Sequence, residues 1–497
     1  MAEKKLKILY AASEVAPLAK TGGLADVAGA LPSALAALGH EVKVVLPFYK
    51  MVKNNVKSIK NFIKKIEVPI ANRTEPGAVD STKLSDNVEA YLIKNDEYYE
   101  RDGLYQTPEG DYDDNAERFI FFCRAILQMV KSINFKPDII HCNDWQTGLI
   151  PAYLKTLYRD DAILSKIATV FSIHNLGYQG LFWALDMPLT NLPWDVFTPD
   201  GVEFYGKISF LKAGLVYSDI INTVSKGYSN EIQTAEYGLG MEGVLQYRKG
   251  DIYGILNGAD YQTWSPKNDK YIAATYDEKN LDNKLNCKMD LLKEYNLKAT
   301  ANVPVIGMIS RLADQKGFDI LTEKLDEIMK LNVRLIILGT GDEKYHDLFN
   351  NLAKKYPQKL GVKLAFDNKL AHKIEAGSDM YLMPSKYEPC GLNQIYSLRY
   401  GTIPIVRATG GLDDTITDVR KNPQKGNGFK FSEYSGSDLL NAVKDAVAAF
   451  RKKVPWKNLM IRCMGMDYSW EKSAKEYVSM YKKAVTNHSK AAKIVSR

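Results

Sequence analysis

A carboxylate beside a glycine turn is the feature of this sequence that points most directly to chemistry. Glu388 lies within residues 384–394 (PSKYEPCGLNQ), between a predicted buried strand at 379–383 and a predicted helix at 392–400. In an open α/β sheet, ligands bind at the carboxyl ends of strands, where loops meet helix N-termini. Gly391 lets backbone amides approach a ligand closely, and the carboxylate accepts hydrogen bonds from hydroxyl groups. The segment therefore predicts a sugar site.

Two cations follow another predicted strand. The motif SRLADQKG (residues 310–317) comes directly after the predicted strand 303–309 and contains Arg311 and Lys316. Arg311 as a planar fork and Lys316 as a point charge could clamp a diphosphate and stabilise negative charge on a leaving group. The alternative is that both are surface cations in a polar loop.

A glycine-rich loop near the N-terminus offers a third cation. Lys20 opens the motif KTGGL, in which Gly22 and Gly23 precede a helix predicted at 25–38. The two glycines permit a tight turn, and amides at a helix start suit a phosphate or a sugar. The spacing differs from GxxxxGK[ST], so it does not predict a P-loop. A flexible loop with a solvated lysine is the alternative.

Further polar residues end other predicted strands. His174 in FSIHNLGYQG could contact a sugar hydroxyl or be a structural histidine. Asp144 in HCNDWQ could orient an acceptor hydroxyl or serve as the N-cap of a helix at 145–154. The motif NGAD (residues 257–260) favours a turn, and TGGLD (residues 409–413) fits a turn or a phosphate-facing loop.

Length and composition limit the class of protein. With 497 residues and 45% apolar side chains, the chain can fill two sizeable cores. The net charge of +7 comes without a dense Lys/Arg tract, so we expect no nucleic-acid partner. Five scattered cysteines without a CxxC pattern indicate a reducing compartment and no zinc framework. We find no signal sequence and no apolar run long enough for a membrane span, and therefore expect a soluble cytoplasmic protein.

Predicted strands alternate with predicted helices in both halves of the chain, which indicates parallel sheets. We predict an α/β fold of two doubly wound, Rossmann-like domains, at residues 1–264 and 265–470, that face each other across a cleft. Residues 471–497 are predicted to form a C-terminal helix that packs on the N-terminal domain. The predicted strands are 7–11, 41–47, 138–142, 168–173, 220–223 and 252–256, then 303–309, 333–338, 362–366, 379–383 and 403–406.

Taken in order, the motifs resemble those of one family. KTGGL, DWQTGL, HNLGYQG, NGAD, SRLADQKG, EPCGLNQ and TGGLDDT are similar to the motifs of bacterial and plant glycogen and starch synthases, and the resemblance covers nearly the whole chain. It implies the GT-B arrangement, with the acceptor glucan on the N-terminal domain and the nucleotide sugar on the C-terminal domain. The implied reaction is retaining transfer of glucose from ADP-glucose to the non-reducing 4-hydroxyl of an α-1,4-glucan such as glycogen. It also implies that no metal or other cofactor is needed.

The resemblance assigns roles by position. Arg311 and Lys316 match the residues that bind the donor phosphates, and Lys20 matches a residue that reaches toward these phosphates. Glu388 matches the carboxylate that contacts the donor glucose, and His174 matches a histidine near glucose O6. These residues, apart from Lys20, form the implied catalytic set. The implied substrate-binding set is Lys20, Gly22, Gly23, Asp26, Asp144, Asn257, Cys390, Gly391, Leu392, Gln394, Thr409 and Gly410.

Several positions depart from the common family pattern or bear on alternatives. Asn143 stands where the family often has His, Asn393 where it usually has Thr, and Ala259 where it usually has Ile or Val. Tyr396 stands where the wider fold class has a second glutamate. No second carboxylate is placed as a nucleophile, which favours front-face attack with Glu388 as a positioning group. The alternatives are a UDP-glucose-dependent synthase, a catalytically silent sugar-binding protein, and a glucan phosphorylase, whose cofactor-bearing lysine context we do not find.

Overall fold

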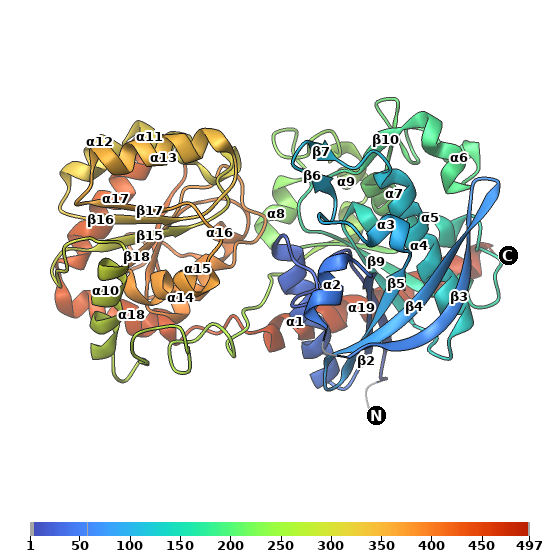
Figure 1. Ribbon diagram of the computed structural model, residues 1–497, viewed down its shortest axis with the longest axis horizontal. Helices are drawn as coiled ribbons and strands as arrows, with labels where there is room; N and C mark the ends of the chain where they lie inside the picture. Colours follow the sequence, from blue (N-terminus) through green and yellow to red (C-terminus); the bar gives the residue numbers. More distant parts are fainter. Residues whose placement is uncertain (1–3, 57, 496–497) are drawn as a thin grey trace. The chain divides into compact units, whose positions relative to one another are not determined.

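The computed structural model describes residues 4–56 and 58–495. The chain forms two compact units, each built on a sheet with helices on both faces (Figure 1). Unit 1 comprises Met1–Val224, Ser229–Gly258 and Trp470–Arg497, and unit 2 comprises Ser225–Tyr228 and Ala259–Ser469.

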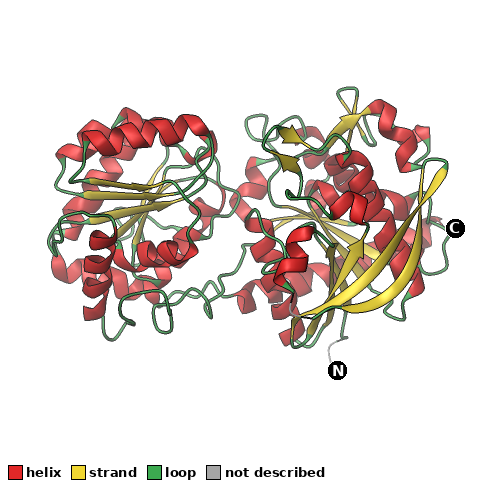
Figure 2. Ribbon diagram, in the orientation of Figure 1, coloured by secondary structure: helices red, strands yellow, loops and turns green. Residues whose placement is uncertain are grey.

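The sheet of unit 1 has nine strands among the described residues, in the order β14-β13-β9-β8-β1-β2-β5-β4-β3. Neighbours from β14 to β5 are parallel, and β3 and β4 add an antiparallel hairpin at one edge (Figure 2). Its strands are β1 (Lys7–Ala11), β2 (Glu41–Pro47), β3 (Lys60–Ile70), β4 (Arg73–Ser85), β5 (Val88–Lys94), β8 (Ile139–Asn143), β9 (Ala168–Ile173), β13 (Ile220–Thr223) and β14 (Ile252–Gly254).

Helices cover this sheet because their apolar faces pack on it. The most buried is α4 (Asn115–Ser132), which carries a run of Phe and Ile side chains. The other helices of the unit are α1 (Gly23–Ala37), α2 (Lys50–Asn55), α3 (Asp96–Tyr99), α5 (Leu149–Lys155), α6 (Met187–Thr190), α7 (Phe210–Tyr217), α9 (Glu242–Tyr247) and α19 (Trp470–Val495), and α8 (Lys226–Glu231) spans the division between the units. Short strands β6 (Gln106–Thr107) and β7 (Gly110–Asp111) form a separate hairpin.

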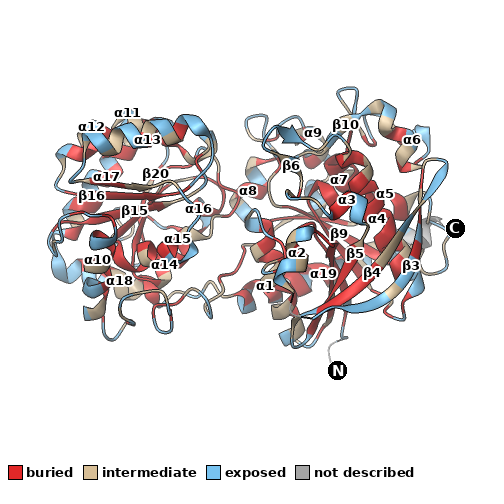
Figure 3. Cartoon of the chain, viewed as in Figure 1, coloured by how far each residue is buried: buried red, intermediate tan, exposed pale blue. Residues whose placement is uncertain are grey.

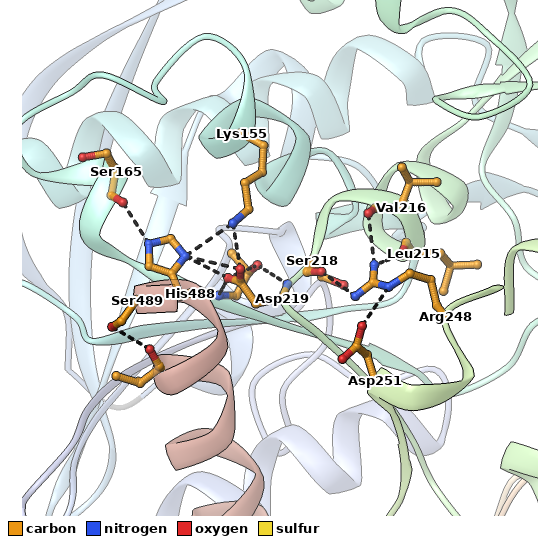
Figure 4. Close-up of polar contacts among 12 residues, drawn as sticks. Lys155, Ser165, Leu215, Val216, Ser218, Asp219, Arg248, Asp251, His488 and Ser489 are labelled. Atoms are coloured by element: carbon orange, nitrogen blue, oxygen red, sulfur yellow. Dashed lines mark hydrogen bonds and ion pairs between the residues drawn. The ribbon is translucent and has the colours of Figure 1, made fainter. Parts of the chain in front are cut away.

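The C-terminal helix α19 is attached to unit 1 by a buried polar cluster (Figure 4). His488 Nε2 donates to the Ser165 carbonyl at 2.9 Å, and Nδ1 lies 3.1 Å from Asp219 Oδ2. Lys155 Nζ pairs with the other carboxylate oxygen of Asp219 at 2.7 Å. Burial would raise the pKa of Asp219, but the hydrogen bond from His488 and the Lys155 charge hold this pKa below its usual value. The cluster therefore stays ionic at neutral pH and fixes the end of the chain.

The sheet of unit 2 is parallel throughout, in the order β17-β16-β15-β18-β19-β20. Its strands are β15 (Val305–Ile309), β16 (Arg334–Leu338), β17 (Leu360–Lys363), β18 (Met380–Met383), β19 (Ile403–Arg407) and β20 (Phe429–Phe431). Its helices are α10 (Asp282–Glu294), α11 (Phe318–Glu323), α12 (Leu325–Lys330), α13 (Glu343–Lys355), α14 (Asn368–Gly377), α15 (Asn393–Arg399), α16 (Gly410–Thr415), α17 (Gly436–Phe450) and α18 (Lys453–Met464). Near-continuous apolar runs form these strands because both faces of the sheet are buried (Figure 3).

Aromatic stacking fixes the start of the long segment of unit 2, Ala259–Ser469. Trp264 lies between His372 and Tyr396, with ring centroids 3.8 and 4.4 Å away and nearly parallel planes. His372 Nδ1 is 2.7 Å from Asp269 Oδ2, and both side chains are buried. Tyr396 stands where the wider fold class has a second glutamate, and in this fold its ring packs against that of Trp264.

The strand predictions are largely confirmed. The predicted strands 7–11, 41–47, 168–173 and 220–223 coincide with β1, β2, β9 and β13. The strand predicted at 362–366 instead begins at Leu360 and ends at Lys363, because Phe366 is exposed in the following loop. None of the helices in the described part of the chain is long and apolar enough to span a membrane.

Among its parallel strands, each sheet has one point at which the strand order reverses. In unit 1 the reversal lies between β1 and β8, and in unit 2 between β15 and β18. In open α/β sheets the loops that leave the carboxyl ends of two such strands diverge and leave room for a ligand. These two points are the places at which the fold predicts a site.

Candidate functional site

The predicted site residues form two groups, one at the strand-order reversal of each sheet. In unit 1 the loop after β1 carries the KTGGL motif, and Asp144 directly follows β8. In unit 2 the motif SRLADQKG follows β15 and the motif EPCGLNQ follows β18. Asn257 in unit 1 and Thr409 and Gly410 in unit 2 follow other strands.

An ion pair joins the two motifs of unit 2. Lys316 Nζ lies 2.7 Å from Glu388 Oε2, and the Ser385 hydroxyl donates to the same oxygen at 2.9 Å. The Glu388 side chain is 9% exposed and that of Lys316 is 17% exposed, so the pair is only partly screened by water. Arg311, on the same loop as Lys316, is exposed. The sequence placed a carboxylate and two cations at one sheet edge, and the structure brings Lys316 and Glu388 into direct contact.

The loops that carry this pair are fixed by backbone contacts. The Lys386 amide donates to the Gln315 carbonyl at 2.8 Å, and Gln315 Nε2 donates to the Tyr387 carbonyl at 3.0 Å. Gly317 has a φ of +72°, and a Cβ there would lie 2.0 Å from the Pro384 carbonyl oxygen. Only glycine fits this position, because the backbone is left-handed and the two loops touch.

Asn393 explains one departure from the family pattern. Its Nδ2 donates to the Ile309 carbonyl at 3.1 Å and to the Tyr381 hydroxyl at 2.5 Å. The Tyr381 hydroxyl also accepts from the Ile309 amide and donates to the Ile309 carbonyl, both at 2.9 Å. Asn393 thus ties the start of α15 to the last residue of β15, next to the loop of Arg311. A threonine has one hydroxyl donor and cannot make both bonds at once.

The glycine step of EPCGLNQ is held by a glutamine. Gly391 has a φ of +68°, and Gln394 Nε2 donates to the carbonyls of Cys390 and Gly391 at 3.0 Å each. Leu392 is the N-cap residue of α15. Gln394 Oε1 is buried and has no hydrogen-bond partner among the described residues. The motif TGGLD, predicted as a turn or loop, begins helix α16 with Thr409 as its N-cap residue.

In unit 1 a buried glutamate supports the KTGGL loop. Glu14 accepts hydrogen bonds from the Thr21 amide at 2.5 Å, the Thr21 hydroxyl at 2.6 Å and the Gly22 amide at 3.0 Å. The Tyr105 hydroxyl donates to Glu14 Oε1 at 2.9 Å. Sequence reasoning missed both residues. A carboxylate six residues before Lys20 in an apolar context was the only available signal.

The surface of this loop is open at its glycines. A Cβ at Gly22 or Gly23 would meet no atom within 4 Å, and neither residue has a positive φ. The fold of this unit therefore does not require glycine at either position, and the backbone of this loop is accessible there. Lys20 Nζ is 2.6 Å from Asp26 Oδ1, so this partly exposed lysine has a charged partner within unit 1.

Asp144 and His174 lie together at the end of β8 and β9. Asp144 Oδ1 accepts from the His174 amide at 2.8 Å, and its side chain caps no helix. The helix predicted from residue 145 is broken into a 3-10 turn, Trp145–Thr147, and α5. Asp144 has φ 55° and ψ −176°, a conformation that costs a non-glycine residue about 1–3 kcal/mol and is found mainly at functional sites. Asp144 is therefore the N-cap residue of the 3-10 turn by position, but its side chain makes no capping hydrogen bond.

Burial shifts both ionisable groups. It raises the pKa of Asp144 to about 7, although the amides of His174 and Asn175 donate to the carboxylate. It also lowers the pKa of His174 to about 4, so this imidazole is neutral at pH 7. Asn143 Oδ1 lies 2.9 Å from His174 Nε2, and Asn143 Nδ2 donates to the Ala11 carbonyl. Because the amide oxygen can only accept, His174 Nε2 carries the proton.

Asn257 is the remaining residue of the unit 1 set. It is buried, and its Oδ1 has no hydrogen-bond partner within residues 4–56 and 58–495. The turn predicted at NGAD is wrong, because residues 255–258 do not form a turn and Ala259 forms a parallel bridge with Ser469.

The two parallel-sheet units, with polar groups and glycine loops at their strand-order reversals, define a glycosyltransferase of the GT-B class. Residues 7–247 match the starch synthase catalytic domain, and residues 294–452 match the glycosyl transferases of group 1. The chain is 51% identical over 479 residues to the glycogen synthase of Koribacter versatilis, covering 96% of this chain and 98% of the relative. It is 47% identical to that of Thermosipho melanesiensis, covering 97% and 99%. The chain belongs to the glycogen synthase family, whose members transfer glucose to an α-1,4-glucan.

Solved structures give the same result. The catalytic domain of starch synthase IV from Arabidopsis thaliana, bound to ADP and acarbose, superposes with a TM-score of 0.90 at 30% identity, covering 97% of this chain and all of that one. A sucrose-phosphate synthase from Thermosynechococcus elongatus shares the fold, with a TM-score of 0.59 at 16% identity. The family, the GT-B fold and the glucosyltransferase activity that the motifs implied are thereby confirmed.

Proposed function

We propose that this enzyme transfers glucose from ADP-glucose to the non-reducing 4-hydroxyl of an α-1,4-glucan, with retention at the anomeric carbon and without a metal ion. The observation that carries the proposal is the Lys316–Glu388 pair at the strand-order reversal of unit 2. ADP in the similar Arabidopsis structure supports the choice of donor. Five free, buried cysteines suit a reducing cytoplasm.

In this proposal unit 2 binds the donor. Arg311 and Lys316 contact the diphosphate and stabilise the negative charge that develops as it departs. Glu388 accepts hydrogen bonds from the hydroxyls of the donor glucose. Its oxygen Oε2 is already bonded to Lys316 and Ser385, which makes the carboxylate a poor nucleophile. Glu388 therefore positions the sugar and does not attack it.

Retention then requires attack from the face of the departing diphosphate. The C1–O bond to the diphosphate breaks, the acceptor O4 forms the new bond to C1, and the proton of O4 moves to the departing phosphate oxygen. This sequence needs no enzyme nucleophile, unlike the double displacement of retaining glycosidases. The neutral ring of His174 adds no positive charge near an oxocarbenium-like sugar.

Unit 1 supplies the acceptor side in this proposal. Asp144 accepts a hydrogen bond from an acceptor hydroxyl, and the open backbone at Gly22 and Gly23 allows a ligand to approach. Lys20 and Asp26 flank that loop as an ion pair. The strained backbone of Asp144 is the observation that favours a functional role over a structural one.

The raised pKa of Asp144 predicts opposite effects of pH on activity and stability. Only the ionised form of Asp144 can accept a hydrogen bond from a hydroxyl group with either oxygen. We therefore expect kcat/KM for the glucan to fall as the pH drops below about 7. The folded state binds this proton more tightly than the unfolded chain. Binding of this proton therefore stabilises the folded state below the ordinary aspartate pKa, and this stabilisation is lost as the pH rises through about 7.

Asp144→Asn tests both effects. We expect a low, flatter pH profile of kcat/KM and, at pH 8, a higher melting temperature than that of the unchanged enzyme. The measurements are initial rates from pH 5.5 to 8.5 and melting curves across the same range. A variant that keeps the acidic limb of the profile would assign this limb to another group.

The proposed function is tested by measuring nucleotide release. The enzyme is incubated with glycogen and either ADP-glucose or UDP-glucose, with and without EDTA. We expect release of ADP that depends on glycogen and is unaffected by EDTA. Faster release from UDP-glucose would overturn the choice of donor, and loss of activity in EDTA would overturn the metal-free mechanism.

A further inference from the structure

A small antiparallel sheet in unit 1 carries exposed aromatic side chains that the reaction does not explain. Its strands are β10 (Leu181–Trp183), β11 (Glu203–Phe204) and β12 (Lys207–Ser209), in the order β10-β12-β11. Five exposed large apolar side chains lie in these strands or within a few residues of them: Tyr178, Leu181, Trp183, Leu185 and Tyr205. Strand β10 lies near helix α6 at the outer edge of unit 1 (Figure 3).

One face of this sheet is part of the core. Phe182 pairs with Ile208, which is fully buried. The ring of Phe182 lies 4.6 Å from that of Phe210 and 5.5 Å from that of Trp145. Since side chains alternate between the faces of a strand, the neighbours of Phe182 and Ile208 lie on the other face.

The other face is open and aromatic. Trp183 pairs with Lys207, and Lys207 also pairs with Phe204 on the next strand. The side chain of Trp183 is 69% exposed. A tryptophan is among the residues most often buried on average, so such exposure on a structured strand indicates a binding surface.

Tyr205 is held at the edge of this face against its backbone preference. Tyr205 and Gly206 join β11 to β12 with φ values of 48° and 76°, the left-handed pair of a type I′ turn. Such turns favour Asn-Gly, and a bulky residue at the first position is strained. The Tyr205 ring meets that of Phe204 edge-on, with ring centroids 4.7 Å apart, but the residue is 82% exposed, so this contact leaves most of the ring open. A strained residue that buries so little of its ring is a candidate for contact with a ligand.

The sheet continues directly from the proposed acceptor residues. Strand β10 begins after the loop of His174, and the Ser209 hydroxyl and the Phe210 amide donate to the carbonyls of Gln179 and Gly180 at 3.1 and 3.0 Å. Trp145, which follows Asp144, packs against its buried face. The sheet is therefore joined to the residues at which the acceptor is proposed to bind, and a long glucan chain can extend onto it.

We propose that the exposed face of β10-β12-β11, with Trp183 and Tyr205, binds glucose units of the acceptor glucan remote from its reacting end. This inference rests on the proposed acceptor role of unit 1. The apolar faces of pyranose rings stack on exposed aromatic rings, and Lys207, which is exposed on this face, provides a polar group for the sugar hydroxyls. A glucan chain is uncharged and extends many residues beyond its reacting end, which fits an aromatic surface at a distance from the reaction.

Trp183→Ala and Tyr205→Asn test the proposal. Asparagine suits the left-handed turn, so Tyr205→Asn removes the ring without destabilising the fold. For the double variant we expect the KM for glycogen to rise about tenfold, because truncation of an aromatic residue that anchors a ligand weakens binding by about this factor. The kcat/KM for maltotriose, which has only three glucose units and so no part remote from its reacting end, is expected to stay unchanged. Mobility in gels that contain glycogen should increase in parallel.

Tyr247→Ala is the matched control, because Tyr247 is 89% exposed at the end of α9 and outside the sheet. An unchanged KM for glycogen in the double variant would overturn the proposal. So would a fall in molecular mass by size-exclusion chromatography, which would identify the face as an interface between copies of this chain. Absence of transfer to both acceptors in the unchanged enzyme would instead refute the proposed function.

Discussion

Replacing Glu388 with alanine is expected to lower kcat for glucan elongation by about two to three orders of magnitude, the loss that follows removal of one preorganised polar group at a reaction centre. The variant loses the acceptor for the glucose hydroxyls. It also leaves Lys316, now without its carboxylate at 2.7 Å, free to bind the donor phosphates in another position. Both effects act on the transition state, so kcat should fall more than the KM for the donor rises.

Glu388→Gln separates these two effects, because the amide keeps the shape and an acceptor oxygen for Ser385 but removes the charge. We expect an intermediate rate. Glu294→Ala is the control: Glu294 pairs with Lys363 and Lys373 at 2.7 and 3.1 Å on the surface of the same unit. Rates are measured with saturating glycogen, and melting curves show whether each variant is folded. A folded Glu388→Ala enzyme with a nearly unchanged kcat would contradict the role of this residue.

The strands could be predicted from sequence where both faces of a sheet are buried. The segments 168–173 and 220–223 are continuous apolar or small runs, and their predicted bounds are those of β9 and β13. The hairpin of β3 and β4 was missed, because its lysines and its prolines, Pro69 and Pro76, obscure the alternation of an edge strand. The lysines and Pro69 of β3 suit its position at the exposed edge of the sheet, where they discourage pairing with other chains.

The candidate site could be predicted only as far as single motifs carry chemistry. Lys316 and Glu388 stand out by residue type and by position after a strand. Glu14 and Tyr381 do not, because their contacts with Tyr105 and Ile309 join segments distant in the sequence. The backbone strain at Asp144 has no sequence signal at all. Supporting residues of this kind become visible only when the fold brings their partners together.

Replacing Lys316 with alanine is the second change with a large expected effect. We expect kcat to fall about a hundredfold or more, because a fixed cation at the departing diphosphate is lost where water screens it little. The KM for the donor should rise as well, since the phosphates also contact this cation in the ground state. Lys344→Ala is the control, because Lys344 is exposed and pairs with Asp314 at 2.5 Å on the same loop.

The double variant Lys316→Ala with Glu388→Gln shows whether the two residues act as a unit. If the pair positions both the sugar and the phosphates, each single change already disrupts the common arrangement. The combined loss in kcat/KM is then smaller than the product of the two single losses. Losses that multiply would mean that Lys316 and Glu388 act independently, and that their contact in this structure is only electrostatic pairing of two separately placed groups. Initial rates of the four enzymes with ADP-glucose and glycogen distinguish the two cases.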